Sequence, residues 1–186
     1  MININVFSNE KAWSKRLKKK ELFFNKICKA FPKKYKFVNK KVSLSLLLSN
    51  NKNIRKLNKD FRNKSKSTDI LSFPINKKIK ISKQTYIGDI IISYDFIDKP
   101  NTQKIIKFKE KYNLSKQTYI GDIIISYNYI NKPKSQSSNL FERKLIKIFI
   151  HGFLHLIGFD HIKNKDYKKM FKEEEQIYQS VISKLY

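Results

Sequence analysis

Cysteine and long apolar runs are scarce in this sequence of 186 residues. Its one cysteine, Cys28, excludes an intrachain disulfide, as in a reducing cytoplasm, and we expect it to be a small hydrophobe on the buried face of a helix. The longest apolar runs, such as residues 44–49 and 87–93, are too short to span a bilayer. The opening "MININVFSNEK" lacks the basic and apolar blocks of a secretory signal. We therefore expect a cytoplasmic protein that does not contact a membrane.

Arginine is also rare, since only four of the 41 basic residues are arginines. Against 15 acidic residues, the basic residues give a formal charge of +26. Such a charge favours RNA binding, because contacts with phosphates release counterions. However, the lysines are scattered along the chain, and abundant lysine, asparagine and isoleucine are typical of an AT-rich genome. The charge is therefore compatible with RNA binding but does not establish it.

The spacing of apolar residues predicts a mixture of strands and helices around a small sheet. Alternation predicts strands at 2–7, 42–49 and 68–74. A helical period predicts helices at 13–31, at 50–61 with Asn50 or Asn51 as N-cap, at 140–156 and at 166–185. The last of these helices carries Tyr167 and Phe171 on or near its apolar face. At this length we expect one domain over residues 1–186.

The middle of the chain contains a duplication of 33 residues. The segment "SKQTYIGDIIISY" occurs at 82–94 and again at 115–127, and weaker similarity extends the copies to 82–103 and 115–136. Two copies are too few for a solenoid, so a tandem duplication explains them. Both copies predict a strand for one position in the sheet. We favour residues 119–129 of the second copy, with 75–107 as extra loop; the first copy, or pairing of both copies, are the alternatives.

All three histidines lie in the eleven residues "HGFLHLIGFDH". His151 and His155 are four residues apart and share one face of a helix, and Gly158 can end that helix and bring His161 back towards them. Three imidazoles leave one tetrahedral position open, as at a catalytic zinc. The spacing therefore predicts a zinc site at the end of the helix. In the alternative, His151 and His155 pack in the core and His161 lies at the surface.

The same spacing occurs in metzincin proteases, which place a glutamate directly after the first histidine as general base. Here that position is Gly152, so peptide hydrolysis is disfavoured. The remaining acidic group of the motif is Asp160, next to the third histidine. We expect Asp160 to orient an imidazole by hydrogen bonding; holding the turn or acting as a base are its alternatives.

These motifs resemble those of the YbeY endoribonucleases, also called rRNA maturation RNases. "HGFLHLIGFDH" resembles the family's histidine signature, "LNKDFRNKSKSTDILSFP" at 57–74 is similar to a second signature, and "IGDIIIS" to a third. The resemblance covers most of the chain. The first copy of the repeat stands at the family's usual distance from "LSFP" and the second at its usual distance from His151, so we interpret the additional unit as a single insertion.

The resemblance implies cleavage of single-stranded RNA, maturation of the 3′ end of small-subunit rRNA and a part in ribosome quality control. It implies ribosomal RNA, the ribosome and ribosome-associated proteins as partners, one zinc ion on His151, His155 and His161, and a catalytic or RNA-contacting arginine at Arg62. The planar fork of an arginine holds a phosphate with two hydrogen bonds, which a lysine cannot do. Arg55 is the weaker alternative.

Other functions remain compatible with the motifs. They are a zinc hydrolase of peptides or small molecules, an RNA- or ribosome-binding protein whose zinc is structural, and a decayed copy whose duplication has broken the fold. Attack by water and attack by the RNA 2′-hydroxyl fit the motifs equally. For the fold we expect the α+β class, with helices packed on a small mixed four-stranded sheet, a metal site at the end of a central helix and one duplicated strand segment.

Overall fold

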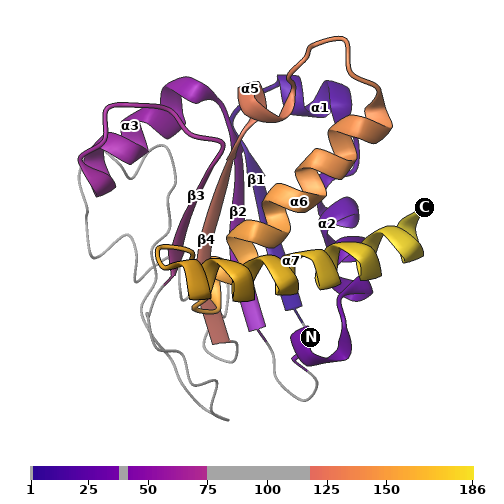
Figure 1. Cartoon of the computed structure of the whole chain (residues 1–186). Coiled ribbons are helices and arrows are strands. Elements are labelled where there is room, and N and C mark those ends of the chain that lie inside the picture. Colours follow the sequence, from indigo (N-terminus) through magenta and orange to yellow (C-terminus); the bar gives the residue numbers. More distant parts are fainter. Residues whose placement is uncertain (1, 38–41, 75–117) are drawn as a thin grey trace.

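The computed structural model of the protein describes residues 2–37, 42–74 and 118–186. A four-stranded sheet lies between helices on its two faces (Figure 1). The strands are β1 (Ile2–Ser8), β2 (Val42–Ser49), β3 (Ile70–Pro74) and β4 (Thr118–Ser126). The helices are α1 (Ala12–Arg16), α2 (Lys20–Ala30), α3 (Asn51–Arg62), α5 (Tyr127–Ile130), α6 (Ser138–Leu156) and α7 (Asn164–Leu185), with a 3-10 turn at Lys33–Tyr35.

The sheet is mixed, and its order is β1-β2-β4-β3. β1 pairs with β2 and β2 with β4 in parallel, whereas β3 pairs with β4 antiparallel at the edge. β2 and β4 are the central strands, and Ile123, Ile124 and Ile125 of β4 are buried on alternating faces, as expected for a strand covered by helices on both sides. The expected α+β fold with a mixed four-stranded sheet is confirmed.

The second copy of the repeat supplies β4, as favoured from the sequence. β4 ends at Ser126, three residues before the predicted end at residue 129, because the chain turns there into α5. The backbone N–H of Ser126 donates to the carbonyl oxygen of Asp69, which closes the last rung beside β3. The first copy, the extra loop at 75–107 and any pairing of the two copies lie outside the described residues.

The larger core lies between the sheet and α2, α6 and α7. Ile123 and Ile125 of β4 face this side, where they meet buried aromatic side chains of the helices. These aromatic side chains are Phe24, Phe31, Phe141, Phe149 and Phe153. On the other face, α3 packs Ile54 and Leu57 against Leu71 and Ile124. Cys28 is buried in the larger core, and burial raises the pKa of its thiol, so it is a packed hydrophobe as expected.

The predicted helix at 13–31 is two helices, which corrects the sequence interpretation. The backbone becomes extended at Leu17, and α2 starts only at Lys20. The break lets Trp13 donate from Nε1 to the carbonyl oxygen of Ser49, 2.9 Å away at the end of β2, while α2 packs along β1. The hydrogen bond of the buried Trp13 indole and the packing of α2 on β1 therefore decide where the helices end, although the apolar spacing alone predicts one continuous helix.

The caps explain where the other helices begin and end. The side chain of Asn50 accepts from the N–H of Asn53 and starts α3, one of the two N-caps predicted. Ser137 caps α6 in the same way. On α7, Met170 is buried on the apolar face, whereas Tyr167 and Phe171 are 54% and 52% exposed, so of the two places expected for them, on or near this face, they take the second. They lie beside the buried stripe, not within it.

None of the helices in the described ranges is both long and apolar enough to cross a membrane.

Candidate functional site

The three histidines come together at the end of α6. His151 and His155 lie one turn apart on the helix, and His161 follows in the loop before α7. One ring nitrogen from each residue lies within 4.8 Å of those of the other two. His151 and His155 are partly buried, whereas His161 is exposed, so the cluster is open to solvent on one side.

A glycine turn brings the third histidine back, as the sequence predicted. Gly158 has φ +94°, a backbone conformation that favours glycine. Its N–H donates to the carbonyl oxygen of His155, and the N–H of Phe159 donates to that of Leu154, both over 3.0 Å. These two bonds form a Schellman motif, which ends α6 and reverses the chain towards His161.

Two hydrogen bonds orient the rings on α6. Nδ1 of His151 lies 3.0 Å from Oε2 of Glu174 on α7, and Nδ1 of His155 lies 3.0 Å from the carbonyl oxygen of Phe159. A carboxylate and a carbonyl accept hydrogen bonds, so both Nδ1 atoms carry the proton. In the neutral rings the two Nε2 atoms are therefore lone-pair nitrogens, and they face each other at 3.2 Å.

This donor set fits a metal ion. Two lone-pair nitrogens at 3.2 Å repel unless a cation or a proton lies between them. Burial lowers the pKa of His155, and the neighbouring His151 lowers it further, so the neutral imidazole that a metal requires is favoured. The cluster can therefore bind a metal ion through three nitrogens and leave a position open towards solvent.

Asp160 has a different contact from the one expected. Its Oδ1 accepts a hydrogen bond of 2.7 Å from the backbone N–H of His161. Among the described residues it makes no hydrogen bond to an imidazole nitrogen. The contact corresponds to the turn-holding alternative, while the orienting role expected for it is filled by Glu174 and the carbonyl of Phe159.

Gly152 lies on the side of α6 that packs against the sheet. A Cβ at this position would lie 2.5 Å from Cδ1 of Ile70, 3.0 Å from Oγ of Ser72 and 3.2 Å from Cγ2 of Ile123. There is no room for the glutamate of a metzincin protease here. The close packing of α6 on β3 therefore explains why position 152 is a glycine. The same glycine was the sequence evidence against peptide hydrolysis.

Arg62 is the last residue of α3, on the opposite face of the sheet from α6. Its NH2 donates to the carbonyl oxygen of Ser72 over 3.2 Å, and its guanidinium lies 5.7 Å from the ring centre of Phe73. The described residues show no contact between Arg62 and the three histidines. Strand β3 connects Arg62 with α6, the helix that carries His151 and His155. The hydroxyl of Ser72 on β3 faces Gly152 on α6, and the carbonyl oxygen of Ser72 accepts the hydrogen bond from Arg62. Arg55 instead donates from Nε to the carbonyl of Ser65.

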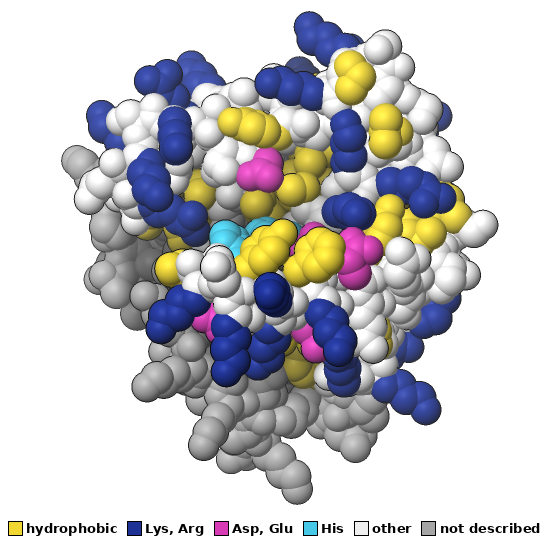
Figure 2. Space-filling view, viewed as in Figure 1, with side chains coloured by type: hydrophobic (Ala, Val, Ile, Leu, Met, Phe, Trp, Pro, Cys, Tyr) yellow, Lys and Arg dark blue, Asp and Glu magenta, His cyan; other side chains and the backbone are white. Residues whose placement is uncertain are grey.

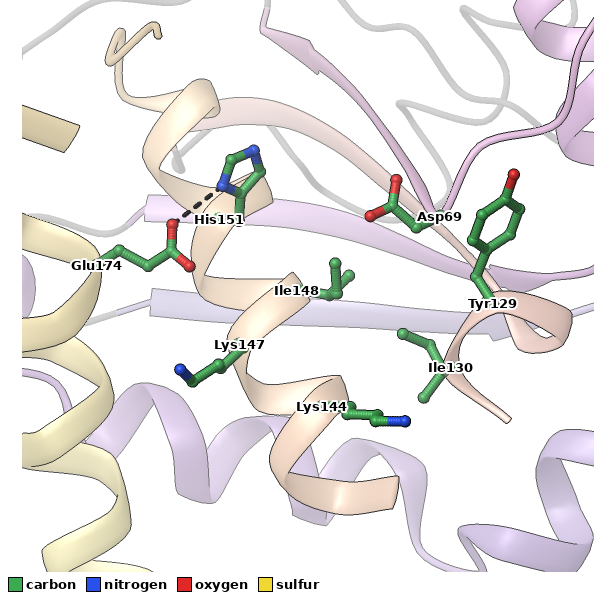
Figure 3. A pocket seen from close by; sticks show the side chains of 8 residues that line it. All are labelled: Asp69, Tyr129, Ile130, Lys144, Lys147, Ile148, His151 and Glu174. Atoms are coloured by element: carbon green, nitrogen blue, oxygen red, sulfur yellow. Dashed lines mark hydrogen bonds and ion pairs between the residues drawn. The ribbon is translucent and has the colours of Figure 1, made fainter. Parts of the chain in front are cut away.

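An open pocket of about 450 Å³ adjoins His151 (Figure 3). Its lining comes from the residue before β3, from α5, and from α6 and α7: Asp69, Tyr129, Ile130, Lys144, Lys147, Ile148, His151 and Glu174. His151 and Glu174 lie at one end, and Asp69 and Tyr129 at the other (Figure 3). The pocket therefore joins the histidine cluster to an aromatic ring and two lysines.

The surface around the histidines is predominantly basic. Figure 2 shows the histidines with exposed hydrophobic and acidic side chains next to them and with Lys and Arg side chains around this centre. Such a surface attracts a negatively charged polymer.

The sequence interpretation missed Glu174 and the two pocket lysines. Glu174 belongs to the run "EEE" at 173–175, which is conspicuous in a lysine-rich chain but lies 23 residues from His151. Lys147 and Lys144 lie four and seven residues before His151, on the same helix face. Helical spacing alone would have identified the lysines, whereas Glu174 required the packing of α7 on α6.

Comparisons with known proteins agree with these motifs. The family model for "Endoribonuclease YbeY" matches residues 5–115 and 104–182, so each match contains one copy of the repeat. The endoribonuclease YbeY of Pelagibacter ubique is 50% identical over 185 residues, which is 100% of this chain and 99% of that protein. It therefore has nearly the same length as this chain.

More distant relatives have the same name. The endoribonuclease YbeY of Sulfurihydrogenibium is 29% identical over 97% of this chain and 94% of its own length. That of Persephonella marina is 28% identical over 76% of this chain and 72% of its own. The solution structure of TM1509 from Thermotoga maritima shares the fold, with a TM-score of 0.50 and 22% identity over 96% of this chain and 88% of that one. On the family match and the Pelagibacter relative, the chain belongs to the YbeY family of endoribonucleases.

Proposed function

We propose that this member of the family is a zinc-dependent endoribonuclease that cuts single-stranded RNA, matures the 3′ end of small-subunit rRNA and takes part in ribosome quality control. We propose further that it is a single domain which works in the cytoplasm on the ribosome and with ribosome-associated proteins. The observation that carries the zinc site is the pair of Nε2 atoms of His151 and His155, held 3.2 Å apart with both Nδ1 atoms bound to acceptors.

Zinc is assigned to His151, His155 and His161, since three imidazoles and an open position are the ligand set of catalytic zinc. Zinc in such a site supplies a Lewis acid that polarises a phosphoryl oxygen or acidifies a water. Glu174 and the carbonyl of Phe159 fix the tautomer and the direction of two rings. The exposed position of His161 leaves room for a polymer to approach.

The pocket next to His151 is the proposed place for a nucleotide beside the cleaved phosphate. Its walls offer apolar surface from Ile130 and Ile148 and a ring from Tyr129, which suit a base. Lys147 lies on its rim within reach of phosphates, although it also contacts Glu175 over 3.3 Å. Entry of a base into this pocket requires a strand whose bases are unpaired, which supports specificity for single strands.

Arg62 is the proposed phosphate-binding arginine. A guanidinium has five N–H donors. Within the described part of the chain, Arg62 donates from its NH2 group to the carbonyl oxygen of Ser72. The rest suit a phosphate with two parallel hydrogen bonds. In this role Arg62 would stabilise negative charge that develops on the phosphate during cleavage.

The competing functions are weaker on physical grounds. A peptidase of the metzincin type lacks its general base, and Gly152 has no space for one. A purely structural zinc has four protein ligands, whereas the cluster in the described residues has three nitrogens.

The test is cleavage of small-subunit precursors that still carry an extended 3′ end, with a single-stranded RNA, its duplex and casein as further substrates. We expect wild type to cut the precursor and the single strand and to leave the duplex and casein intact. His155→Ala should lose all cleavage, while Lys29→Ala on the distant helix α2 should keep it. Cleavage by His155→Ala, or digestion of casein, would refute the proposal.

A further inference from the structure

Two aromatic side chains stand exposed on the first half of α7. Tyr167 is 54% exposed and Phe171 is 52% exposed. Their ring centres lie 6.1 Å apart and their planes are inclined by only 17°. The two rings thus form an open, nearly parallel pair beside Met170 and Ile177, which are the buried residues of the same part of α7.

The aromatic pair is aligned with the histidine site. Residues 167, 171 and 174 are spaced by four and three, so they form one stripe along α7. At the end of this stripe Glu174 binds Nδ1 of His151 over 3.0 Å. Figure 2 shows exposed hydrophobic side chains beside the histidines. A polymer that is bound at the three histidines and runs along α7 towards its N-terminus would pass over the two rings.

The charge around the pair suits a nucleic acid. Between residues 163 and 172 the chain has five lysines and one acidic residue, Asp166, and all six are exposed. Lysines next to exposed aromatic rings are the pattern of proteins that bind single strands, in which phosphates meet the cations and bases stack on the rings. A duplex hides its bases and cannot use the rings.

We propose that Tyr167 and Phe171 are a base-stacking platform for single-stranded RNA next to the histidine site. The inference rests on the proposed ribonuclease function and deepens it, because it assigns the direction in which the substrate strand leaves the histidines, along α7. The platform contributes to binding of the strand and takes no part in the chemical step. Because every base has an aromatic face, it accepts any sequence.

The test measures stacking separately from charge and from cleavage. Binding of the full chain is compared for two labelled single-stranded DNA probes of about 12 nucleotides, a length within the range of single-strand binding sites. One probe carries its bases, and the other has abasic spacers with the same phosphates. A ribonuclease does not cut either probe. The preference of wild type for the probe with bases, over the abasic probe, is the quantity to compare among variants.

We expect wild type to bind the probe with bases at least about fivefold more tightly than the abasic probe. Tyr167→Ala/Phe171→Ala should lose most of this preference and keep only the part that comes from the pocket beside Tyr129. Tyr167→Phe/Phe171→Tyr should keep it, which shows that loss in the alanine variant comes from the rings. Phe7→Ala removes a ring that is 49% exposed on the edge strand β1 and does not belong to α7. This control variant should also keep the preference for the probe with bases.

No preference in wild type, or the same preference in the alanine variant, would overturn the platform. Sedimentation tests whether the rings are a dimer contact instead. If wild type is a dimer, and the alanine variant is a monomer that still prefers the probe with bases, the platform is overturned. RNA cleavage is measured in parallel. Cleavage without a base preference refutes the platform alone, whereas a base preference without cleavage refutes the proposed nuclease alone.

Discussion

Glu174 and His151 join the last helix to the candidate metal centre: Oε2 of Glu174 on α7 lies 3.0 Å from Nδ1 of His151 on α6. The bond fixes which nitrogen of His151 faces the other two histidines. The histidine motif orients His155 through its own Phe159, but it does not supply the acceptor for His151. It depends on a residue 23 positions away, held by the packing of α7 against α6.

Removal of Glu174 should weaken metal binding. In Glu174→Ala the imidazole of His151 loses its acceptor and can adopt either tautomer, so we expect the zinc affinity to fall by about 10- to 100-fold. Glu174→Gln keeps an acceptor oxygen but loses the charge, and should fall between wild type and Glu174→Ala. Competition with a zinc chelator of known affinity measures these differences.

Two neighbouring acidic groups serve as controls for that experiment. Asp160→Asn keeps an acceptor for the N–H of His161, and Glu175→Gln alters only an exposed ion pair with Lys147. Both should bind zinc within about twofold of wild type, since surface pairs contribute little. Equal zinc affinity of Glu174→Ala and wild type would contradict the orienting role of Glu174.

Much of the site could be predicted from short-range patterns. The spacing of His151 and His155, the turn at Gly158 and the N-cap at Asn50 depend on residues a few positions apart, and the structure has the helical face, the left-handed glycine and the cap. The second copy was favoured for the sheet, and it supplies β4. Local sequence carries this information because helices and turns are set by neighbouring residues.

What the sequence did not predict depends on tertiary packing. The break after α1 follows from the hydrogen bond between Trp13 and Ser49, 36 residues apart. Tyr167 and Phe171 are exposed because α7 packs the neighbouring Met170 and Ile177 into the core instead. The helical period alone does not tell which of these adjacent apolar residues is buried. Glu174 was missed for the same reason.

Arg62 is expected to act on turnover more than on binding. Arg62→Lys keeps the charge but loses the second hydrogen bond to a phosphate, so we expect kcat on single-stranded RNA to fall by roughly 10- to 100-fold while RNA affinity changes far less. Arg55→Lys, on the same helix, is the matched control and should change neither. Equal losses in kcat and in affinity would remove Arg62 from the chemical step. If Arg62→Lys instead lowers the free energy of unfolding by as much as it raises the activation free energy of cleavage, the role of Arg62 is to hold β3 through Ser72.

Gly152→Ala should destabilise the contact between α6 and the sheet. The added methyl group would lie 2.5 Å from Cδ1 of Ile70, so either α6 or β3 must shift. We expect the free energy of unfolding in urea to fall by about 1–3 kcal/mol, despite the higher helix propensity of alanine. Ser138→Ala, at an exposed position of the same helix, should change it by less than about 0.5 kcal/mol. An unchanged or higher stability of Gly152→Ala would show that the packing is looser than the structure indicates.

The contact between Glu173 and the segment before β2 should make stability depend on pH in the acid range. Hydrogen bonds from Lys34 and Tyr35 lower the pKa of Glu173 from its ordinary value of 4.5. Because the folded pKa is the lower one, the stabilisation is complete above pH 4.5 and is lost as the pH falls through the folded pKa. The unfolding free energies of wild type and Glu173→Gln should therefore differ above pH 4.5, by at most about 1 kcal/mol since Lys34 is half exposed, and converge in acid. A difference that does not change across this pH range would contradict the assignment.

We propose that His151, His155 and His161 together hold one zinc ion and that RNA cleavage requires it. The most direct test is a zinc titration of the full chain after chelation, with bound metal and cleavage of single-stranded RNA measured on the same samples. We predict that cleavage is absent without metal, rises in proportion to bound zinc and reaches its maximum at one zinc per chain, and that His155→Ala neither retains this zinc nor recovers cleavage. Full cleavage by metal-free protein, or recovery of cleavage by His155→Ala at one zinc per chain, would contradict the proposed zinc site.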